Sequence, residues 1–284
     1  MAETLAQALR RATARLERAG VPAAEADAVQ LAGHLLGLQR GEVAARAIIG
    51  ADAPEGLDEL VERRAAREPL QHIVGTAPFR RLAIQVGPGV FIPRPETELL
   101  VELLVERLRE DQADGEARPV VVDLCTGSGA IAAAVADEVP HARVHAIELD
   151  PQALHWARRN LEGTRVDLRE GDATHAPEDL RGRCAAVVSN PPYVPAREPI
   201  TQPEVLEHDP AAALWGGGDD GMEMPRRIIA AAAQLLRPAG WCVLEHAESQ
   251  AEDMQEQMRS SGFEQVQLHQ DLTGRPRATS GVLA

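Results

Sequence analysis

The sequence predicts an α/β protein in which a mostly parallel sheet, covered by helices on both faces, follows a small helical bundle. Three observations favour this architecture. Residues 4–67 have helical periodicity, residues 69–95 divide into short β-like pieces, and from residue 120 onward β-branched runs alternate with helical ones. Strands that alternate with helices of about 10 to 15 residues are typical of parallel sheets, because parallel neighbours need a crossover connection.

The N-terminal helices are predicted from apolar spacing and from residues that start or end a helix. Thr4 is a suitable N-cap and Gly20 a suitable end for the first helix, and further helices are expected over residues 22–36, 41–47 and 57–67. The pattern indicates binding or packing rather than chemistry, and we assign residues 1–72 to this domain. The apolar face of the first helix comprises Leu5, Ala8, Leu9, Ala12 and Leu16.

Residues 73–95 are predicted to form a β-hairpin linker, because "HIVGTAPF", "LAIQVGPG" and "VFIPRP" combine β-forming residues with Gly and Pro. Residues 96–284 are assigned to the sheet domain. Its expected strands are "VVVDL", "RVHAIEL", "RVDLRE", "AAVVSN", "WCVLEH", "FEQVQL" and "ATSGVLA".

Composition excludes several classes of protein. No apolar run approaches the ~20 residues of a membrane span, and the N-terminus lacks the apolar core of a signal peptide, so a cytoplasmic protein is expected. Cys125, Cys184 and Cys242 form no CxxC pair and have no nearby His at ligand spacing, which predicts reduced thiols and no metal site. The net charge of −15, with arginine as the only basic residue type besides His, disfavours a nucleic-acid partner.

A glycine-rich turn follows the first strand of the sheet domain. In "VVVDLCTGSGAIAAAVA", Gly127 and Gly129 stand between strand and helix, followed by Ala132. Glycine permits a ligand to approach the backbone, and the helix N-terminus favours polar groups. The next strand ends at Glu148, 21 residues after Gly127, where a carboxylate can bind ribose hydroxyls. These features predict a nucleoside or dinucleotide cofactor.

Two further acids favour S-adenosylmethionine over NAD. Asp123, at the end of the strand before the turn, would repel a pyrophosphate but suits a cofactor with a positive centre or an amino group. Asp172 in "REGDAT" follows the third strand, where it can accept a hydrogen bond from an adenine amino group. An NAD-dependent oxidoreductase stays an alternative, although the sequence supplies no evident acid or base for hydride transfer.

The stretch "SNPPY" follows a buried strand. Because ligands of open α/β sheets bind at the carboxyl ends of the strands, Asn190 is expected near the glycine turn. Pro191 and Pro192 fix the backbone and remove two donors, so that Asn190 Oδ1 and the Pro191 carbonyl can accept both hydrogens of one planar NH2 group. Tyr193 can pack over that plane. An amide nitrogen held in this way can attack a sulfonium methyl, because positioning offsets its weak nucleophilicity.

Together, "DLCTGSGAIA", "SNPPYV" and "FIPRPETELLVE" resemble the HemK/PrmC family, the peptide chain release factor N5-glutamine methyltransferases. The similarity extends to "EPLQHIVGTAPF", "ALWGGGDDGMEMPRRII" and "DLTGRPRATSG". The resemblance implies a Rossmann-like methyltransferase domain preceded by a helical substrate-recognition domain. It also implies methyl transfer from S-adenosylmethionine, leaving S-adenosylhomocysteine, to the glutamine of the GGQ motif in class I release factors.

The resemblance assigns roles to individual residues. Asn190, Pro191, Pro192 and Tyr193 match the catalytic motif that binds the substrate amide. The cofactor is expected to contact Asp123, Thr126, Gly127, Ser128, Gly129, Glu148, Asp172 and Asn190.

The motif "RPETE" has two interpretations. Arg94 and Glu96 match a family motif and are expected to contact the substrate in the crevice. Alternatively the segment starts a helix, with Thr97 and the acids forming its first turn. The residues alone leave both open.

Two positions depart from the family pattern. Cys125 stands where many relatives have glycine, which predicts an ordinary backbone conformation there. Ala185 replaces a polar residue common near the start of the fourth strand. Neither touches the expected chemistry.

Other functions compete with this interpretation. Amino-methyltransferases of adenine or cytosine in nucleic acid use a similar loop, but aromatic residues are only 2% of this chain, which leaves few platforms for base stacking. A methyltransferase of a ribosomal-protein glutamine would differ at "PRPETELL". A scaffold that merely binds a nucleoside would have no use for the amide clamp.

Overall fold

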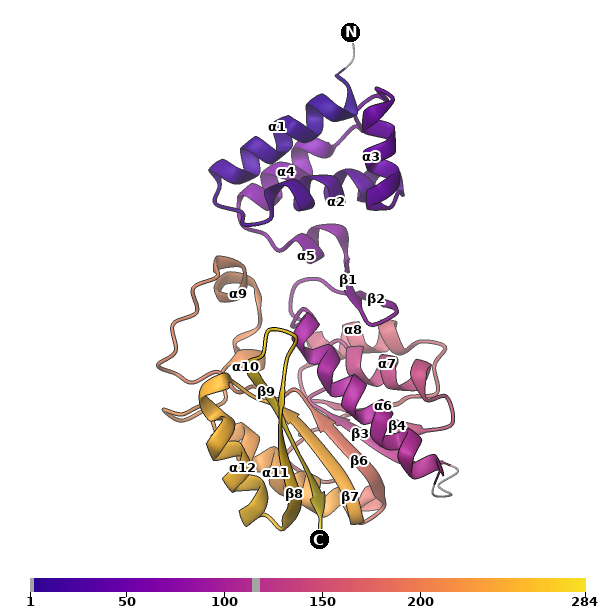
Figure 1. Ribbon diagram of the computed structural model, residues 1–284, viewed down its shortest axis with the longest axis vertical. Helices are drawn as coiled ribbons and strands as arrows, with labels where there is room; N and C mark the ends of the chain where they lie inside the picture. The colour runs from indigo at the N-terminus through magenta and orange to yellow at the C-terminus, as the bar shows by residue number, and fades with distance from the viewer. Residues whose placement is uncertain (1–2, 114–117) are drawn as a thin grey trace. The chain divides into compact units, whose positions relative to one another are not determined.

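The computed structural model describes residues 3–113 and 118–284, and the chain divides into two compact units (Figure 1). The helical unit comprises Met1–Thr76 together with Ile200–His208. The sheet unit comprises Ala77–Pro199 and Asp209–Ala284. Ile200–His208, which we call the return segment, therefore leaves the sheet unit and belongs to the N-terminal helices. None of the described helices combines the length and apolarity needed to cross a bilayer.

The helical unit begins as predicted. Thr4 caps the first helix, since its Oγ1 accepts a hydrogen bond from Gln7 N at 3.4 Å and Gln7 Oε1 accepts one from Thr4 N at 3.0 Å. Gly20, with φ of +73°, follows the end of the helix. The helices are α1 (Leu5–Arg18), α2 (Ala24–Leu36), α3 (Arg40–Ile48), α4 (Leu57–Ala65), α5 (Leu70–Val74) and α9 (Pro203–His208).

Two predictions for this unit are wrong. The fourth helix ends at Ala65 rather than at residue 67, because Arg67 adopts a left-handed φ of 70°. In addition, "HIV" of the expected β-piece lies in α5, whose N-cap is Pro69 and whose C-cap is the left-handed Gly75. Proline suits the start of a helix and glycine its end, so these two residues outweigh the β preference of isoleucine and valine.

A buried ion-pair cluster holds the return segment to the helices. Arg64 Nε on α4 donates to Asp27 Oδ2 on α2 at 2.8 Å, and Arg64 Nη1 lies 2.8 Å from Glu204 Oε1. Arg67 Nη2 donates to Glu204 Oε2 at 2.6 Å. Burial acts to raise the pKa of Glu204, but the hydrogen bonds from the two arginines outweigh it and lower that pKa. The carboxylate is therefore kept ionised within this cluster.

The sheet unit contains a mostly parallel sheet, which confirms the predicted fold class. The strand order is β5-β4-β3-β6-β7-β9-β8, and the direction in which successive strands are added reverses between β3 and β6. The parallel strands are β3 (Val120–Leu124), β4 (Arg143–Glu148), β5 (Asp167–Glu170), β6 (Cys184–Ser189) and β7 (Leu236–Glu245). The antiparallel pairs join β9 (Pro276–Leu283) to β7 and to β8 (Phe263–Gln270).

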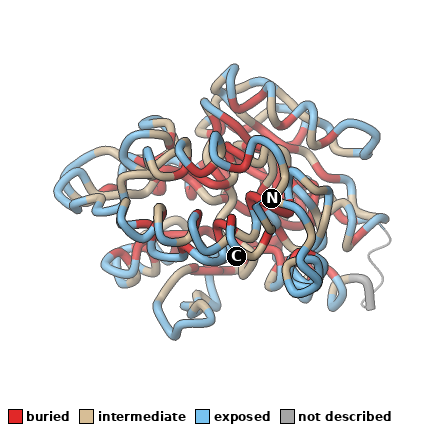
Figure 2. The backbone as a smooth tube through the Cα atoms, turned by 90° about the horizontal axis from the view of Figure 1, so that it is seen from above, coloured by how far each residue is buried: buried red, intermediate tan, exposed pale blue. Residues whose placement is uncertain are grey.

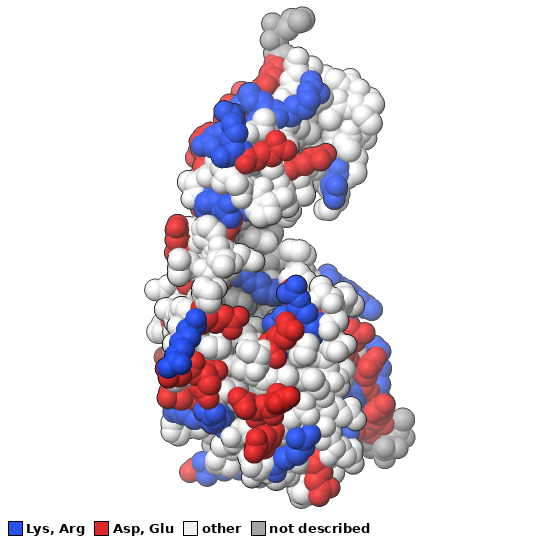
Figure 3. Space-filling view, turned by 60° about the vertical axis from the view of Figure 1, so that its left-hand side comes forward, with Lys and Arg blue, Asp and Glu red and all other residues white. Residues whose placement is uncertain are grey.

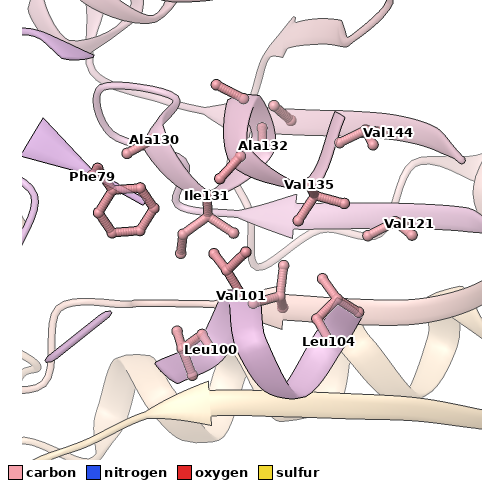
Figure 4. Close-up of a cluster of buried hydrophobic side chains, with 14 of the residues drawn as sticks. Phe79, Leu100, Val101, Leu104, Val121, Ala130, Ile131, Ala132, Val135 and Val144 are labelled. Atoms are coloured by element: carbon pink, nitrogen blue, oxygen red, sulfur yellow. The ribbon is translucent and has the colours of Figure 1, made fainter. Parts of the chain in front are cut away.

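Helices cover both faces of this sheet. Val121 and Val144 belong to the buried cluster that contains the inner sides of α6 (Glu98–Ala113), α7 (Ala130–Glu138) and α8 (Pro151–Leu161). Figure 4 shows part of this cluster, with Val101 of α6 below Ile131 of α7. The alternate residues Val122 and Leu244 belong to the cluster with α11 (Glu223–Leu235) and α12 (Ala251–Ser260). In Figure 2 most buried residues lie in the inner part of the molecule and exposed residues on its outer turns.

The hairpin docks on the sheet unit. Strands β1 (Thr76–Phe79) and β2 (Leu82–Gln85) form a two-stranded sheet, and Arg80 between them donates from Nε to Glu138 Oε1 of α7 at 2.7 Å. The prediction of a third β-piece at "VFIPRP" is wrong. Pro93 and Pro95 supply no N–H donors for a ladder, and Pro95–Thr97 forms a 3₁₀ turn before α6 instead.

We expect Arg64→Met to lower the free energy of unfolding by about 3–5 kcal/mol, because it leaves the buried Asp27 carboxylate without its hydrogen-bonded cation and Glu204 with Arg67 alone. The neighbouring Arg63→Met is the matched control. It removes the more exposed pair between Arg63 and Glu68, and we expect it to cost no more than about 1 kcal/mol. Urea unfolding of both variants measures the difference, and equal effects would contradict the importance of the buried cluster.

Candidate active site

The loops that follow four parallel strands line one pocket of about 450 Å³ in the sheet unit. These loops follow β3, β4, β5 and β6, and the segments 89–97 and 210–214 complete the walls. A pocket at the carboxyl ends of the strands and at the topological switch point is typical of ligand sites in open α/β sheets. The predicted site residues that line it are Thr126, Gly127, Ser128, Glu148, Asp172, Asn190, Pro192 and Tyr193.

Asp123 lies beneath the glycine turn rather than in the pocket wall. It is fully buried, and its Oδ2 accepts hydrogen bonds from Thr126 Oγ1 and, at 3.1 Å, from Ala132 N at the start of α7. Burial raises the pKa of Asp123 to about 7, although these hydrogen bonds act in the opposite direction. Asp123 thus fixes the turn that faces the ligand. The predicted Gly129 also lies behind the wall, where a Cβ would stand 3.1 Å from Leu161 Cγ of α8.

The prediction for Cys125 is wrong. Its φ is 60°, so the residue adopts the left-handed conformation that glycine favours, although it carries a side chain. The buried surroundings, with Glu148 and Asp123 nearby, raise the pKa of its thiol, which therefore stays protonated. Cys125 lines the pocket with an uncharged side chain, and its own backbone is strained at this turn. The signal for this conformation was the family pattern, in which many relatives have glycine at this position.

Glu148 ends β4 at the pocket. Its Oε2 accepts a hydrogen bond from Gly127 N at 2.8 Å, and its Oε1 accepts two at 2.9 Å from the backbone N–H groups of Leu149 and Asp150. Burial raises the pKa of this carboxyl, and the three backbone donors only partly oppose that effect. Oε2 retains acceptor capacity for a ligand hydroxyl, since each carboxylate oxygen can accept two hydrogen bonds.

Asp172 lines the pocket next to Glu148, on the loop after β5. Its Oδ1 accepts hydrogen bonds from Thr174 N at 2.9 Å and Thr174 Oγ1 at 2.7 Å, while Oδ2 lies 3.0 Å from His175 Nδ1. Burial acts to raise the pKa of Asp172, but the bonds from Thr174 and the nearby His175 outweigh it and lower that pKa. The group is an ionised acceptor at the rim of the pocket.

The Asn190 side chain is held by residues that sequence reasoning did not assign to the site. Asn190 Nδ2 donates to Thr97 Oγ1 at 3.1 Å, and Thr97 Oγ1 donates to Glu245 Oε2 at 2.7 Å. Tyr193 OH donates to the other carboxylate oxygen, Glu245 Oε1, at 2.8 Å. Glu245 ends β7 and is only 2% exposed. No sequence motif could assign Glu245 to the site, because its partners Tyr193 and Thr97 are 52 and 148 residues away in sequence.

The backbone of the "NPPY" loop is supported from the 3₁₀ turn Glu248–Gln250 before α12 and from the glycine-rich loop after α10 (Ala211–Leu214). Gln250 Nε2 donates to Tyr193 O at 2.7 Å and to Asp220 O at 2.8 Å. At Gly221, with φ of +70°, a Cβ would lie 2.3 Å from Tyr193 O, so only glycine permits this approach. The run "GGGDDG" indicated a close approach of the backbone to another segment, but the sequence did not identify Tyr193 as the residue it contacts.

Three other predicted site residues do not line the pocket. Arg94 binds Asp209 through Nη2, and its guanidinium lies 4.9 Å from the ring centroid of Phe91, which does line the pocket. Glu96 is exposed on the 3₁₀ turn, and Pro191 is buried beside Asn190. Of the motif "RPETE", it is Thr97 that reaches the pocket wall.

The polar groups that line the pocket fit S-adenosylmethionine better than a dinucleotide. Among its described lining residues are the carboxylates of Glu148, Asp150 and Asp172, and none is an arginine, so a pyrophosphate would meet repulsion. Glu148 would hold ribose hydroxyls and Asp172 the adenine amino group, with apolar side chains such as Leu149 between them.

We expect Glu148→Gln to weaken the binding of S-adenosylhomocysteine by about 10-fold or more at neutral pH, because a charge-assisted acceptor is lost. Since the pKa of Glu148 is raised, wild-type affinity should fall as the pH is lowered towards that pKa and the carboxylate is protonated. The variant should lose this part of the pH dependence, while any remaining slope belongs to groups such as Asp123.

Titration calorimetry between about pH 5 and pH 8 measures both effects. The matched control is Glu170→Gln, since Glu170 ends the neighbouring strand β5 but lies outside the pocket lining. Wild-type affinity in Glu148→Gln would remove Glu148 from the site.

Comparison with known proteins identifies the family. Residues 7–75 match the family model of the PrmC N-terminal domain, and residues 82–209 match that of the methyltransferase small domain. The release factor glutamine methyltransferase of Streptomyces coelicolor is 50% identical over 268 residues, which cover 94% of this chain and 93% of that protein. The protein of the same name from Mycolicibacterium smegmatis is 46% identical over 280 residues, covering 96% and 95%.

A relative named for a different activity is also similar. The 4-amino-L-phenylalanine/4-methylamino-L-phenylalanine methyltransferase of Streptomyces pristinaespiralis is 41% identical over 263 residues, covering 92% of this chain and 89% of that protein. The higher identities, over nearly the whole length, are to enzymes that act on release factors. The chain belongs to the family of release factor glutamine methyltransferases.

Proposed function

We propose that this protein transfers a methyl group from S-adenosylmethionine to the side-chain amide nitrogen of the GGQ glutamine in class I release factors. The observation that carries this proposal is the orientation of Asn190 in the pocket wall. Because Nδ2 donates to Thr97, the amide presents Oδ1, an acceptor, to a ligand. A glutamine amide offers two N–H donors, which Asn190 Oδ1 and the Pro191 carbonyl would accept together.

The residues of the site act by positioning. Asn190 would orient the substrate nitrogen and stabilise the positive charge that develops on it. Tyr193, held by Glu245, would pack against the amide plane. The bound cofactor supplies an electrophilic methyl group on a sulfonium. The amide nitrogen held by Asn190 would accept this methyl group and release one proton to solvent, and the cofactor would leave as the thioether S-adenosylhomocysteine.

The helical unit would bind the release factor. Residues 7–75 match a domain defined in this family, and no pocket-lining residue comes from the described part of that unit. A division into a recognising unit and a reacting unit explains why the chain carries both. A release factor substrate also assigns the enzyme to the cytoplasm, where translation ends.

A second candidate substrate is an aromatic amine. The relative named for 4-amino-L-phenylalanine favours it, and the pocket contains the aromatic rings of Phe79 and Phe91. An arylamine resembles an amide in being planar with a delocalised lone pair, so the same acceptors would suit both. Release factor glutamine ranks first because the more similar relatives are named for it.

The charge distribution disfavours a nucleic-acid substrate. On the face drawn in Figure 3, acidic and basic side chains alternate over each unit rather than forming a basic surface. Together with the net charge of −15, this leaves little attraction for a phosphate backbone.

We expect peptide mass spectrometry to detect one added methyl on the GGQ glutamine after a class I release factor is incubated with the enzyme and S-adenosylmethionine. A release factor with that glutamine replaced by alanine is the control. Methylation of 4-amino-phenylalanine but not of the release factor would favour the second candidate, and cofactor binding without either product would contradict the proposal.

We expect Asn190→Ala to reduce turnover of the release factor below detection while the affinity for S-adenosylhomocysteine stays within about 3-fold of wild type, since positioning of the nucleophile is lost but the cofactor contacts remain. Turnover by mass spectrometry and affinity by calorimetry are compared on the same preparation. A parallel loss of turnover and affinity would show that Asn190 serves the cofactor rather than the substrate.

A further inference from the structure

The Asn190 amide belongs to a buried chain of hydrogen bonds whose direction can be assigned. Thr97 is 4% exposed and Glu245 is 2% exposed, so neither exchanges its partner freely with water. Thr97 Oγ1 contacts Glu245 Oε2 at 2.7 Å on one side and Asn190 Nδ2 at 3.1 Å on the other. Because the Thr97 hydroxyl donates its one hydrogen to Glu245 Oε2, it has only lone pairs left for Asn190 Nδ2. The hydroxyl therefore selects the NH2 end of the amide.

Hydroxyl donors and a cation surround the buried Glu245 carboxyl and act against the effect of burial. Tyr193 OH donates to Oε1 at 2.8 Å, and burial beside Glu245 keeps the pKa of Tyr193 well above its usual value, so the phenol remains a donor. Arg277 lies on β9, which pairs with β7, and attracts the carboxylate electrostatically. Glu96, on the 3₁₀ turn, is the like charge that opposes it. Burial raises the pKa of Glu245, and the two hydroxyl donors and Arg277 only partly oppose that effect.

A purely structural role does not explain this arrangement. A buried carboxylate is costly to desolvate, and apolar residues of similar volume commonly stabilise a fold at least as well. Glu245 nevertheless stands at the pocket end of β7, where it joins two side chains that line the pocket, Thr97 and Tyr193. What the carboxyl group adds is direction, because both hydroxyls donate to it.

We propose that Thr97 and Glu245 are positioning residues that determine which end of the Asn190 amide faces the substrate. The inference rests on the proposed function, in which Asn190 Oδ1 accepts a hydrogen bond from a substrate NH2 group. Without the chain of hydrogen bonds, the Asn190 amide can turn and present its own NH2 group. The N–H donors of Asn190 would then face the N–H donors of the substrate, and no hydrogen bond could form. Thr97 and Glu245 therefore act on catalysis through Asn190.

The experiment compares three variants with the wild type. Thr97→Val keeps the shape but removes the hydroxyl, and we expect kcat for release factor methylation to fall by about 100-fold. Thr97→Ser keeps the hydroxyl and should restore most of the activity. Glu245→Gln offers one acceptor where two hydroxyls donate, and we expect kcat to fall by about 10-fold or more. In all three the affinity for S-adenosylhomocysteine should stay within about 3-fold of wild type, because the cofactor contacts are elsewhere.

Thr279→Val is the matched control. Thr279 is a buried threonine on β9 whose Oγ1 bonds to His246 Nε2 at 2.9 Å, outside the pocket lining. Its loss should lower the melting temperature without a comparable fall in kcat. Equal kcat values in Thr97→Val and wild type would overturn the proposal, as would failure of Thr97→Ser to recover activity in a protein that melts like wild type.

The outcome for the wild type separates this inference from the proposed function. If the wild type binds S-adenosylhomocysteine but does not methylate the release factor, the proposed substrate fails. If the wild type methylates it and Thr97→Val does so equally well, only the positioning role fails.

Discussion

The parallel register between β3 and its two neighbours is the constraint on which the site depends. Leu124 at the end of β3 pairs with Ile147 on β4 and with Ser189 on β6, and Ser189 Oγ donates to Leu124 O at 2.6 Å. Parallel strands end at the same edge, so the glycine turn, the acid after Ile147 and the amide after Ser189 all emerge together. A shift of one residue in this register would reverse the face of every side chain and separate these groups.

The polar groups behind the pocket wall are as important as those that line it. Asp123 fixes the turn from below, and Glu245 fixes the side chains of the "NPPY" loop. Both carboxyls are buried, and burial opposes their ionisation, so each is retained only with hydrogen-bond donors directed at it. Cys125 adds backbone strain to the same region. Directed hydrogen bonds to buried carboxyls thus support the site from behind.

The path of the chain joins the amide-binding loop to the helical unit. After Tyr193 the chain pairs with the strand-like segment at Trp215, where Val194 N donates to Leu214 O at 2.8 Å. Between these paired ends it runs out to the return segment, whose Glu204 is held by Arg64 and Arg67. The unit proposed to recognise the release factor is therefore covalently continuous with the loop proposed to bind its glutamine, through a short connection on either side.

The sequence by itself determined the order of elements and the residues at the strand ends. The seven predicted β-branched runs form seven strands. Gly127, Glu148, Asp172 and Asn190 each follow or end a parallel strand, and such strands end at the same edge of the sheet. Their places in the sequence were therefore sufficient to predict that they line one pocket. Local preference failed where turn residues overrode it, as at α5 between Pro69 and Gly75.

Only the tertiary structure decided which distant side chains meet. The contact of Asn190 with Thr97 spans 93 residues, and that of Thr97 with Glu245 spans 148, so no periodicity or spacing connects them. The same holds for the pairing of Arg94 with Asp209, which turns an expected substrate contact into a bond within the sheet unit. Such contacts depend on how strands and loops pack in three dimensions, and a hydrogen bond forms only when its donor and acceptor lie within about 3.2 Å of each other.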